Sequence, residues 1–354
     1  MRSLATIKEI SRIEPIEGAD LIEKAIIGGW QVVVKKNEFK KGDKVVYFEI
    51  DSFIPYELAP FLCKDKIHEF NGVKGHKLRT VKLKGCLSQG LILPLDILPS
   101  DTYELGQDVS DILGIQKYEV VEIDNSGLLR SSFPSNIQKT DQERIQNLSL
   151  PEYYDRYEVT EKLEGTSCTI YWNDANELQV CSRNYALKDP VNSAYGQILN
   201  KYKDVLERKL PKNLALQGEI CGPQVSGNIY GLIKFEFYLF DIYDTNTHSY
   251  LTKEKRDAVL QQINQDEEIK IPVCPVVDAA FNMTDSLTMD KLLDYADGYS
   301  VINPKVRREG LVFKSLTDSN KSFKIISNEY LLKSKKTENF KHSEKESTTG
   351  LSPS

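Results

Sequence analysis

The first 120 residues are a succession of short apolar runs separated by turn residues. Runs rich in β-branched and aromatic residues cover positions 25–27, 30–34, 44–50, 77–83 and 90–94. Turn residues fall between them, at Gly28-Gly29, at Lys41-Gly42-Asp43 and around Gly85. Closely spaced strands with few helical stretches predict a small closed β-barrel over residues 1–120.

Residues 121–158 are predicted to connect this barrel to a second domain, because the stretch is polar and Ser131-Ser132-Phe133-Pro134-Ser135 is typical of a loop. A short helix is expected to begin at Thr140, whose hydroxyl can cap it, with Glu143 three positions further on. Pro151 would end that helix.

From residue 159 to 335 the apolar pattern alternates between the periods of strands and helices. Strands are expected at 178–183, 214–220, 235–243, 310–314 and 322–326. Helices are expected at 193–210, 251–263 and 289–296. The stretch 336–354 is rich in Lys, Ser, Glu and Thr, so it is predicted to be disordered.

Composition narrows the class of protein. The 354 residues are enough for two domains, and the 40% hydrophobic content is that of an ordinary soluble protein. The net charge of −6 argues against indiscriminate coating of nucleic acid, although it leaves room for a local basic groove. Neither the six cysteines nor the four histidines have zinc-type spacing. Without a signal peptide or a long apolar run, an intracellular location, cytoplasmic or nuclear, is expected.

The tetrapeptide Lys162-Leu163-Glu164-Gly165 suits covalent nucleotidyl transfer. The amine of Lys162 can attack the α-phosphorus of a nucleoside triphosphate, and the carboxylate of Glu164 can hold the ribose. The glycine lets the backbone approach the nucleotide closely. A Lys-x-x-Gly pattern also arises by chance in many proteins, where the lysine is only solvated, so the tetrapeptide alone is a weak indication.

Five later segments each place a polar residue beside an expected strand: Ser182-Arg183-Asn184, Gln217-Gly218-Glu219, Phe240-Asp241, Glu309-Gly310 and Lys324. In order and spacing, the whole set resembles the motif series of the covalent nucleotidyltransferases, which are ATP-dependent ligases and mRNA capping enzymes. DNA ligases and capping enzymes usually carry aspartate at the position of Glu164, whereas a glutamate there is similar to the RNA ligase 2 branch. The element Lys139-Thr140-Asp141, followed by Arg144, Gln146 and Asn147, is also typical of RNA ligases.

The barrel of residues 1–120 resembles the OB-type module of the Deinococcus-type RNA ligases. The resemblance implies an α+β protein, with an OB-like barrel followed by a nucleotidyltransferase domain of antiparallel sheets over residues 159–335. It implies an ATP-dependent RNA ligase that joins 3′-hydroxyl and 5′-phosphate ends through lysyl-AMP and adenylylated RNA. Nicks in duplex RNA or RNA–DNA hybrids would be its substrates, and a monomer is expected.

The same resemblance implies roles for particular residues around the nucleotide. Lys162 would be the nucleophile, and neighbouring cations, including a bound metal ion and Lys324, are expected to favour its neutral amine. The other roles would be phosphate contacts for Arg183 and Lys324, a ribose contact for Glu164, adenine stacking for Phe240, and Mg²⁺ or Mn²⁺ binding for Glu219 and Glu309. Arg183 could instead form a surface ion pair, and Phe240 could be a core aromatic.

RNA contacts are expected from Arg144 and from the basic residues Arg79, Lys82 and Lys84, which could equally be solvated charges. Phage enzymes of the RNA ligase 2 type carry a further lysine where this chain has Ser322. Lys321 would point to the other face of the strand, so Lys314 or a residue elsewhere would have to contribute the second cation. The alternatives are a DNA-nick or capping-type nucleotidyltransferase, and a non-catalytic OB-fold RNA-binding protein with a degenerate second domain.

Overall fold

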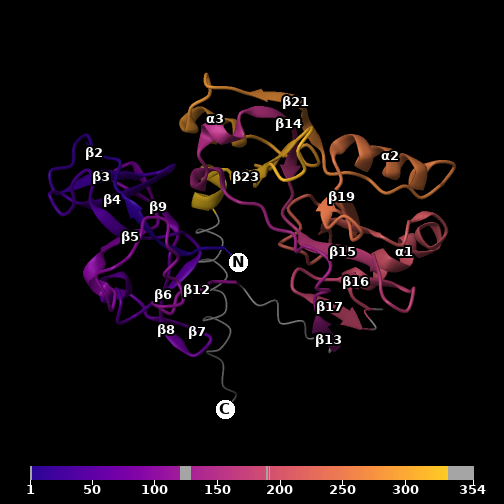
Figure 1. The fold of residues 1–354 in the computed structure, drawn as a ribbon, viewed down its shortest axis with the longest axis horizontal. Coiled ribbons are helices and arrows are strands. Elements are labelled where there is room, and N and C mark those ends of the chain that lie inside the picture. The colour runs from indigo at the N-terminus through magenta and orange to yellow at the C-terminus, as the bar shows by residue number, and fades with distance from the viewer. Residues whose placement is uncertain (1, 120–128, 189, 191, 334–354) are drawn as a thin grey trace, which may run out of the picture. The chain divides into compact units, whose positions relative to one another are not determined.

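The computed structural model describes residues 2–119, 129–188, 190 and 192–333, and the fold falls into two compact units (Figure 1). Residues 2–119, Gln146–Leu148 and 331–333 form the first unit, and the other described residues form the second. The segment 336–354, predicted to be disordered, lies outside the described residues.

The first unit is built from short antiparallel strands. Its strands are β1 (Ala5–Glu9), β2 (Arg12–Pro15), β3 (Ile22–Ile27), β4 (Trp30–Lys35), β5 (Lys44–Phe48), β6 (Ser52–Pro55), β7 (His68–Phe70), β8 (Val73–Lys77), β9 (Thr80–Leu83), β10 (Cys86–Gln89), β11 (Leu91–Pro94) and β12 (Gln116–Lys117), with 3₁₀ turns η1 (Pro60–Cys63) and η2 (Leu95–Ile97). Strand β5 is buried on both faces. Val46 and Phe48 pack into one apolar cluster, and Val45 and Tyr47 pack into another around Trp30.

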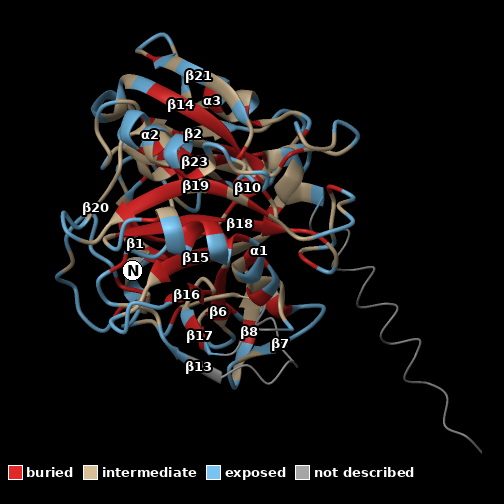
Figure 2. Ribbon diagram, turned by 90° about the vertical axis from the view of Figure 1, so that its right-hand side faces the viewer, coloured by how far each residue is buried: buried red, intermediate tan, exposed pale blue. Residues whose placement is uncertain are grey.

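Two antiparallel sheets form the second unit. The larger has the order β13 (Leu129–Ser132), β17 (Tyr185–Lys188), β16 (Leu178–Cys181), β15 (Thr166–Trp172), β18 (Leu214–Cys221), β19 (Glu236–Asp244) and β20 (Ser249–Tyr250). The smaller has the order β21 (Val276–Met283), β14 (Asp155–Lys162), β22 (Gly310–Ser315) and β23 (Ser322–Ile326). Buried residues run along β14, β15, β18 and β19 (Figure 2).

The three predicted helices of this unit are present as α1 (Ala194–Lys209), α2 (Lys253–Asn264) and α3 (Met289–Ala296). The hydroxyl of Ser193 caps α1 by accepting a hydrogen bond from the Gly196 amide. Ile198, Tyr202 and Val205 recur at helical spacing, and they pack α1 into the core of the larger sheet.

The prediction of a helix that begins at Thr140 is wrong. Residues 140–143 are not helical, and only the 3₁₀ turns η3 (Ile145–Asn147) and η4 (Leu150–Tyr153) follow them. The Thr140 hydroxyl lies 2.5 Å from that of Ser167, and the backbone of Glu143 accepts a hydrogen bond from the Lys324 amide. Tertiary contacts therefore use the capping group and the backbone that a helix would need.

The two faces of the smaller sheet differ in character. Tyr157, Phe313 and Phe323 share one face, and the rings of Phe313 and Phe323 stack with their centroids 4.7 Å apart. Because strand side chains alternate, Lys162 and Lys324 lie on the opposite face. The aromatic face anchors the sheet, and the other face is left for polar chemistry.

Candidate active site

Lys162 is the last residue of β14, and it pairs with Gly310 at the start of β22. The residue before that glycine, Glu309, accepts a hydrogen bond from the Lys162 ammonium, with Nζ and Oε1 2.7 Å apart. The side chains of Lys162 and Glu309 are 28% and 16% exposed. The pair is therefore partly shielded from water but still reachable by a substrate.

Glu219 joins this pair from the larger sheet. It lies on β18 opposite Ser167 of β15, and it accepts a hydrogen bond from the Gly165 amide. Burial and the nearby Glu309 carboxylate raise the pKa of Glu219 to about 8, against the opposing effect of the Lys162 charge. The nucleophile predicted from the sequence and the two predicted metal ligands thus come together from two sheets.

The electrostatic surroundings of Lys162 differ from the expectation that cations would favour its neutral amine. Burial lowers the pKa of Lys162, but Glu309 and Glu219 together raise it more, so the net shift is upward. The guanidinium of Arg144 lowers it only weakly. Carboxyl groups, Glu309 first, dominate around the amine rather than Lys324, so Lys162 is held as an ammonium in the protein alone.

The backbone of Glu164 contacts two members of an apolar cluster, Tyr230 and Cys221. Leu163, Cys221, Tyr230 and Cys274 are the buried members of this cluster, and Phe240 and Ile302 are among the residues that pack against it. The Glu164 amide donates a hydrogen bond to the Tyr230 hydroxyl at 2.5 Å, and the Tyr330 hydroxyl bonds to the Glu164 side chain. Sequence reasoning missed both tyrosines, since each lies more than sixty positions from Glu164 along the chain.

Phe240 is half-buried in β19, so it is neither fully a core residue nor free of the core. The Lys314 ammonium lies 5.2 Å from the centroid of its ring and also donates a hydrogen bond to its carbonyl oxygen. Lys314 forms an ion pair with Asp241 at 2.8 Å. Lys314 is thus engaged with β19. These contacts give no support to the expectation that Lys314 supplies the second cation in place of the lysine that Ser322 replaces.

Arg183 and Lys324 are linked by the carboxylate of Asp141. The distances are 3.2 Å from Asp141 Oδ1 to the Lys324 ammonium and 3.7 Å from Oδ2 to the Arg183 guanidinium. Arg144, expected to contact RNA, is only 5% exposed and forms a parallel backbone bridge with Lys324. Its influence on the pKa of Lys162 also places Arg144 inside the site.

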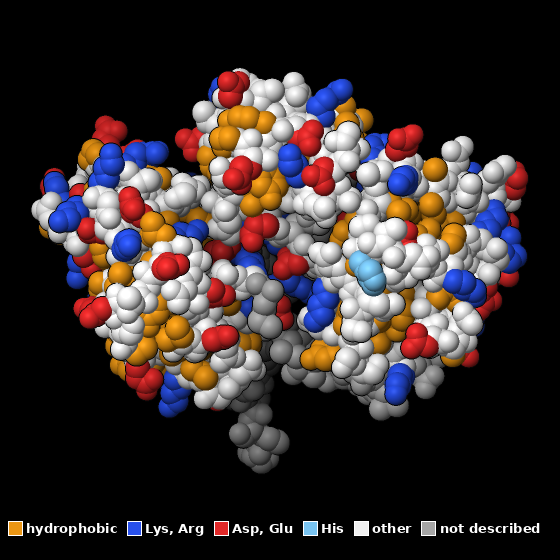
Figure 3. Space-filling model, in the orientation of Figure 1, with side chains coloured by type: hydrophobic (Ala, Val, Ile, Leu, Met, Phe, Trp, Pro, Cys, Tyr) orange, Lys and Arg blue, Asp and Glu red, His pale blue; other side chains and the backbone are white. Residues whose placement is uncertain are grey.

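The other expected RNA contacts belong to the first unit. Arg79 precedes β9, Lys82 lies on β9, and Lys84 lies in the turn to β10 with a φ of 50°. Lys82 and Lys84 are exposed and Arg79 is half-buried. On the face drawn in Figure 3, basic and acidic side chains are intermixed, and this face shows no broad patch of one sign.

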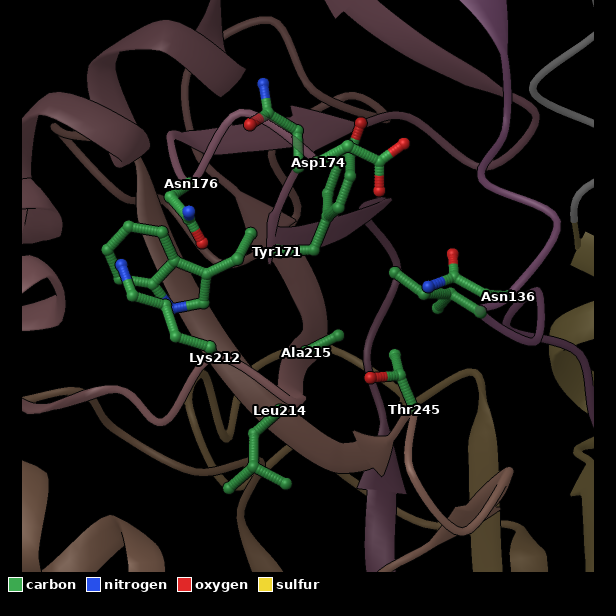
Figure 4. Close-up of a pocket in the computed structure, with 11 residues that line it drawn as sticks. Asn136, Tyr171, Asp174, Asn176, Lys212, Leu214, Ala215 and Thr245 are labelled. Carbon is green, nitrogen blue, oxygen red and sulfur yellow. The ribbon is translucent and has the colours of Figure 1, made fainter.

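A separate cavity of about 230 Å³ lies at the end of β15 opposite to Thr166 (Figure 4). Its lining includes Tyr171, Asp174, Lys212 and Thr245, and none of the site residues predicted from the sequence. Over Trp172, the Lys212 ammonium lies 3.1 Å from the ring centroid. This cavity is therefore separate from the cluster around Lys162.

Two antiparallel sheets that bring a strand-end lysine against two glutamates are the arrangement expected of a covalent nucleotidyltransferase. A family profile described as RNA ligase matches residues 155–326, and one described as an OB-fold domain matches residues 4–95. The chain belongs to the RNA ligase family. The predicted α+β architecture, with an N-terminal OB fold and an antiparallel nucleotidyltransferase domain, is confirmed.

Solved structures of the RNA ligase of Naegleria gruberi resemble this chain over nearly its full length. One with pyrophosphate is 43% identical with a TM-score of 0.86, and covers 94% of this chain and 98% of its own. A mutant with ATP and manganese is 42% identical with a TM-score of 0.86, covering 93% and 98%. A further mutant, with AMP and manganese, is 42% identical with a TM-score of 0.85, again covering 93% and 98%. A comparison with curated proteins finds no match.

Among the described residues, no helix is long and apolar enough to cross a bilayer.

Proposed function

We propose that this RNA ligase uses ATP to join a 3′-hydroxyl end to a 5′-phosphate end, with Lys162 as the nucleophile. The observation that carries the proposal is the contact of the Lys162 ammonium with Glu309 at 2.7 Å, beside Glu219, in a member of the RNA ligase family. The two carboxylates beside Lys162 can bind a divalent metal ion, and a metal ion there would favour loss of the proton from the Lys162 ammonium.

The reaction has three nucleotidyl transfers. Deprotonated Lys162 forms a bond from Nζ to the α-phosphorus of ATP, and the bond from that phosphorus to the bridging oxygen breaks, releasing pyrophosphate. The AMP then passes from Lys162 to the RNA 5′-phosphate, which restores the amine. Finally the RNA 3′-hydroxyl attacks the activated 5′-phosphate, loses its proton, and AMP leaves.

The carboxylates of Glu219 and Glu309 fit a divalent cation, because Mg²⁺ and Mn²⁺ prefer oxygen ligands. Among the residues that the structure describes, no group of three or more His, Cys, Asp or Glu could form a complete cage. Mg²⁺ commonly keeps waters and substrate phosphates as ligands, so two protein carboxylates suffice. A bound cation would oppose the effect of the two carboxyl groups that raise the pKa of Lys162, would favour the ionised form of Glu219, and would offset charge on the α-phosphate.

We assign the remaining nucleotide contacts by chemistry and position. Arg183 and Lys324 would bind phosphate oxygens of the nucleotide. Because Arg144 is buried, it too would bind the nucleotide phosphates instead of RNA. Glu164 would accept a hydrogen bond from a ribose hydroxyl, and the exposed part of the Phe240 ring would stack on adenine. Arg79, Lys82 and Lys84 would contact the backbone of the RNA, and nicked duplexes are the proposed substrate class.

Labelling with α-³²P-ATP in the presence of Mg²⁺ or Mn²⁺, followed by a denaturing gel, tests the proposal. We expect a labelled band from the wild-type protein and none from Lys162→Ala. Lys203→Ala is the matched control, because Lys203 is a 55% exposed lysine on α1 of the same unit. The labelled protein should then transfer AMP to nicked RNA.

Absence of the band from wild-type protein, after removal of any bound AMP with pyrophosphate, would contradict the proposal and favour a non-catalytic RNA-binding protein. A band with transfer only to nicked DNA, or to a diphosphate-ended RNA, would instead favour the DNA-ligase or capping alternative.

A further inference from the structure

The segment from Gln138 to Arg144 crosses from one sheet of the second unit to the other. At one end, Gln217 of β18 donates a hydrogen bond to the Gln138 carbonyl at 2.7 Å. In the middle, the Thr140 hydroxyl lies 2.5 Å from that of Ser167 on β15. At the other end, the backbone of Glu143 accepts the Lys324 amide of β23 at 2.8 Å. We call residues 138–144 the bridging segment.

Within the bridging segment, the carboxylate of Asp141 contacts two cations from different sheets. Lys324 lies on β23 of the smaller sheet, and Arg183 follows β16 of the larger. Their charged groups lie 3.2 Å and 3.7 Å from the two Asp141 oxygens. Lys324 and Arg183 are 141 positions apart in the sequence (324 − 183), and no sequence pattern predicts that they share a partner.

The value of these contacts to stability is small. Asp141 and Arg183 are 39% and 41% exposed, and exposed ion pairs contribute roughly 0–1 kcal/mol because water screens them and long side chains lose freedom. Their geometric effect is larger, since each cation is on a long, flexible side chain. A shared anion restricts both charged groups to positions within hydrogen-bond or ion-pair range of the same point.

We propose that Asp141 is a positioning residue for lysine adenylylation. It sets the separation of the Lys324 and Arg183 charges so that both meet the phosphates of ATP when the α-phosphorus is in line with Lys162. Asp141 itself contacts neither ATP nor the reacting atoms, because a carboxylate repels phosphate. The inference rests on the proposed function and adds a residue for which no role was assigned from the sequence.

Repulsion gives the proposal a distinctive signature. Removing the Asp141 charge frees two cations to attract phosphate, so ATP should bind equally well or more tightly. The same change lets those cations adopt unproductive positions, and a misplacement of about 1 Å can reduce a rate by on the order of 100-fold. A falling rate with unchanged or tighter binding is therefore expected.

The test is Asp141→Asn, measured in two ways. Single-turnover formation of lysyl-AMP gives the maximal rate, which should fall about tenfold or more. Equilibrium binding of ATP, in a Lys162→Ala background where no chemistry occurs, should show a dissociation constant that is unchanged or lower. Asp141→Glu keeps the charge and should recover part of the rate.

Glu236→Gln is the matched control, because Glu236 forms an ion pair with Lys201 at 3.3 Å with similar exposure, 32% and 34%. It should leave both quantities at the wild-type values. Combining Asp141→Asn with Arg183→Ala should reduce the rate by less than the product of the separate effects, since both changes act through one contact.

Three outcomes would overturn the proposal. An Asp141→Asn rate equal to that of wild type would show that the two cations need no positioning. Weaker ATP binding would show that Asp141 contacts the nucleotide or its metal ion directly. A slower rate accompanied by a loss of thermal stability larger than that of Glu236→Gln, and not recovered by Asp141→Glu, would show a merely structural role. If the wild-type protein forms no lysyl-AMP, the proposed function itself fails.

Discussion

Lys162, Glu219 and Glu309 affect one another's protonation. The two carboxylates raise the pKa of the Lys162 amine, while burial and Glu309 raise that of Glu219. The cluster thus holds its protons tightly in the protein alone, which is unfavourable for a nucleophile. Such tight proton binding suits an enzyme in which Lys162 loses its proton only after a metal ion and ATP have both bound.

In protein kept free of divalent ions with EDTA, the free energy of unfolding should depend on pH through the protonation of Glu219. The folded pKa of about 8 exceeds the usual 4.5, so the stability that Glu219 contributes is fully present below about pH 4.5 and is lost as the pH rises to about 8. Glu219→Gln keeps the neutral form at every pH. The Tm of the variant minus that of wild type should therefore increase by several degrees as the pH rises from 4.5 to 8.

The measurement is a thermal melt across that pH range, with Glu236→Gln as a control whose difference from wild type stays flat. A constant difference for Glu219→Gln would mean that Glu219 is ionised in the folded protein throughout.

The pairing of β15 with β18 connects the lysine motif to Glu219, which is predicted to bind a metal ion. Gly165 immediately precedes β15, and Ser167 lies opposite Glu219 in the register. A Cβ atom on Gly165 would lie 2.3 Å from the Ile220 carbonyl oxygen and 2.9 Å from Cγ of Glu219. Glycine is required there because two backbones approach closely, independently of any role in nucleotide binding.

Gly165→Ala should consequently lower both stability and rate. Relieving the overlap must push β18 away, at a cost of about 1–3 kcal/mol in the free energy of unfolding. Because Glu219 moves with β18, lysyl-AMP formation should slow by on the order of tenfold or more. Urea unfolding and single-turnover labelling measure the two effects.

Gly42→Ala separates the two effects. Gly42 has a φ of 89° and no atom within 4 Å of an added Cβ, so this variant suffers backbone strain alone. It should lose stability and keep the wild-type rate. A wild-type rate in Gly165→Ala as well would mean that the spacing of β15 and β18 does not control Glu219.

Each of the two units has its own apolar core. Trp30, 1% exposed, is central to a cluster of the first unit, and its indole N–H donates to the Asn147 side chain at 2.7 Å. The residues that form the lysine site all belong to the second unit. If the first unit engages RNA as proposed, mutations in it should affect RNA sealing without affecting lysine adenylylation.

Trp30→Ala should destabilise the first unit by about 3–5 kcal/mol, through lost burial and the cavity left behind. Calorimetry should show an early transition for that unit. Labelling of Lys162 by ATP should persist at temperatures between the two transitions, whereas sealing of nicked RNA should be lost. Loss of labelling at the first transition would instead show that the units unfold together.

Much of the second unit could be read from short stretches of sequence. The apolar positions of α1 and the alternation along β22 and β23 are local patterns, and the structure has these elements where they were predicted. The helix at Thr140 failed because its capping hydroxyl is used by Ser167, a partner that no local pattern specifies. The boundaries at residues 120, 158 and 335, and the roles of individual site residues, stay predictions.

The chain's order of motifs indicated the family, the nucleophile and its carboxylates, because such motifs are contiguous and their chemistry follows from residue type. The contacts of Lys162 with Glu309, of Lys314 with Asp241, and of Asp141 with Lys324 join residues from 73 to 183 positions apart. Pairings of that separation depend on sheet register and on which strands become neighbours. Only the folded chain therefore decides that two carboxyl groups lie beside the lysine and that one aspartate contacts both Lys324 and Arg183.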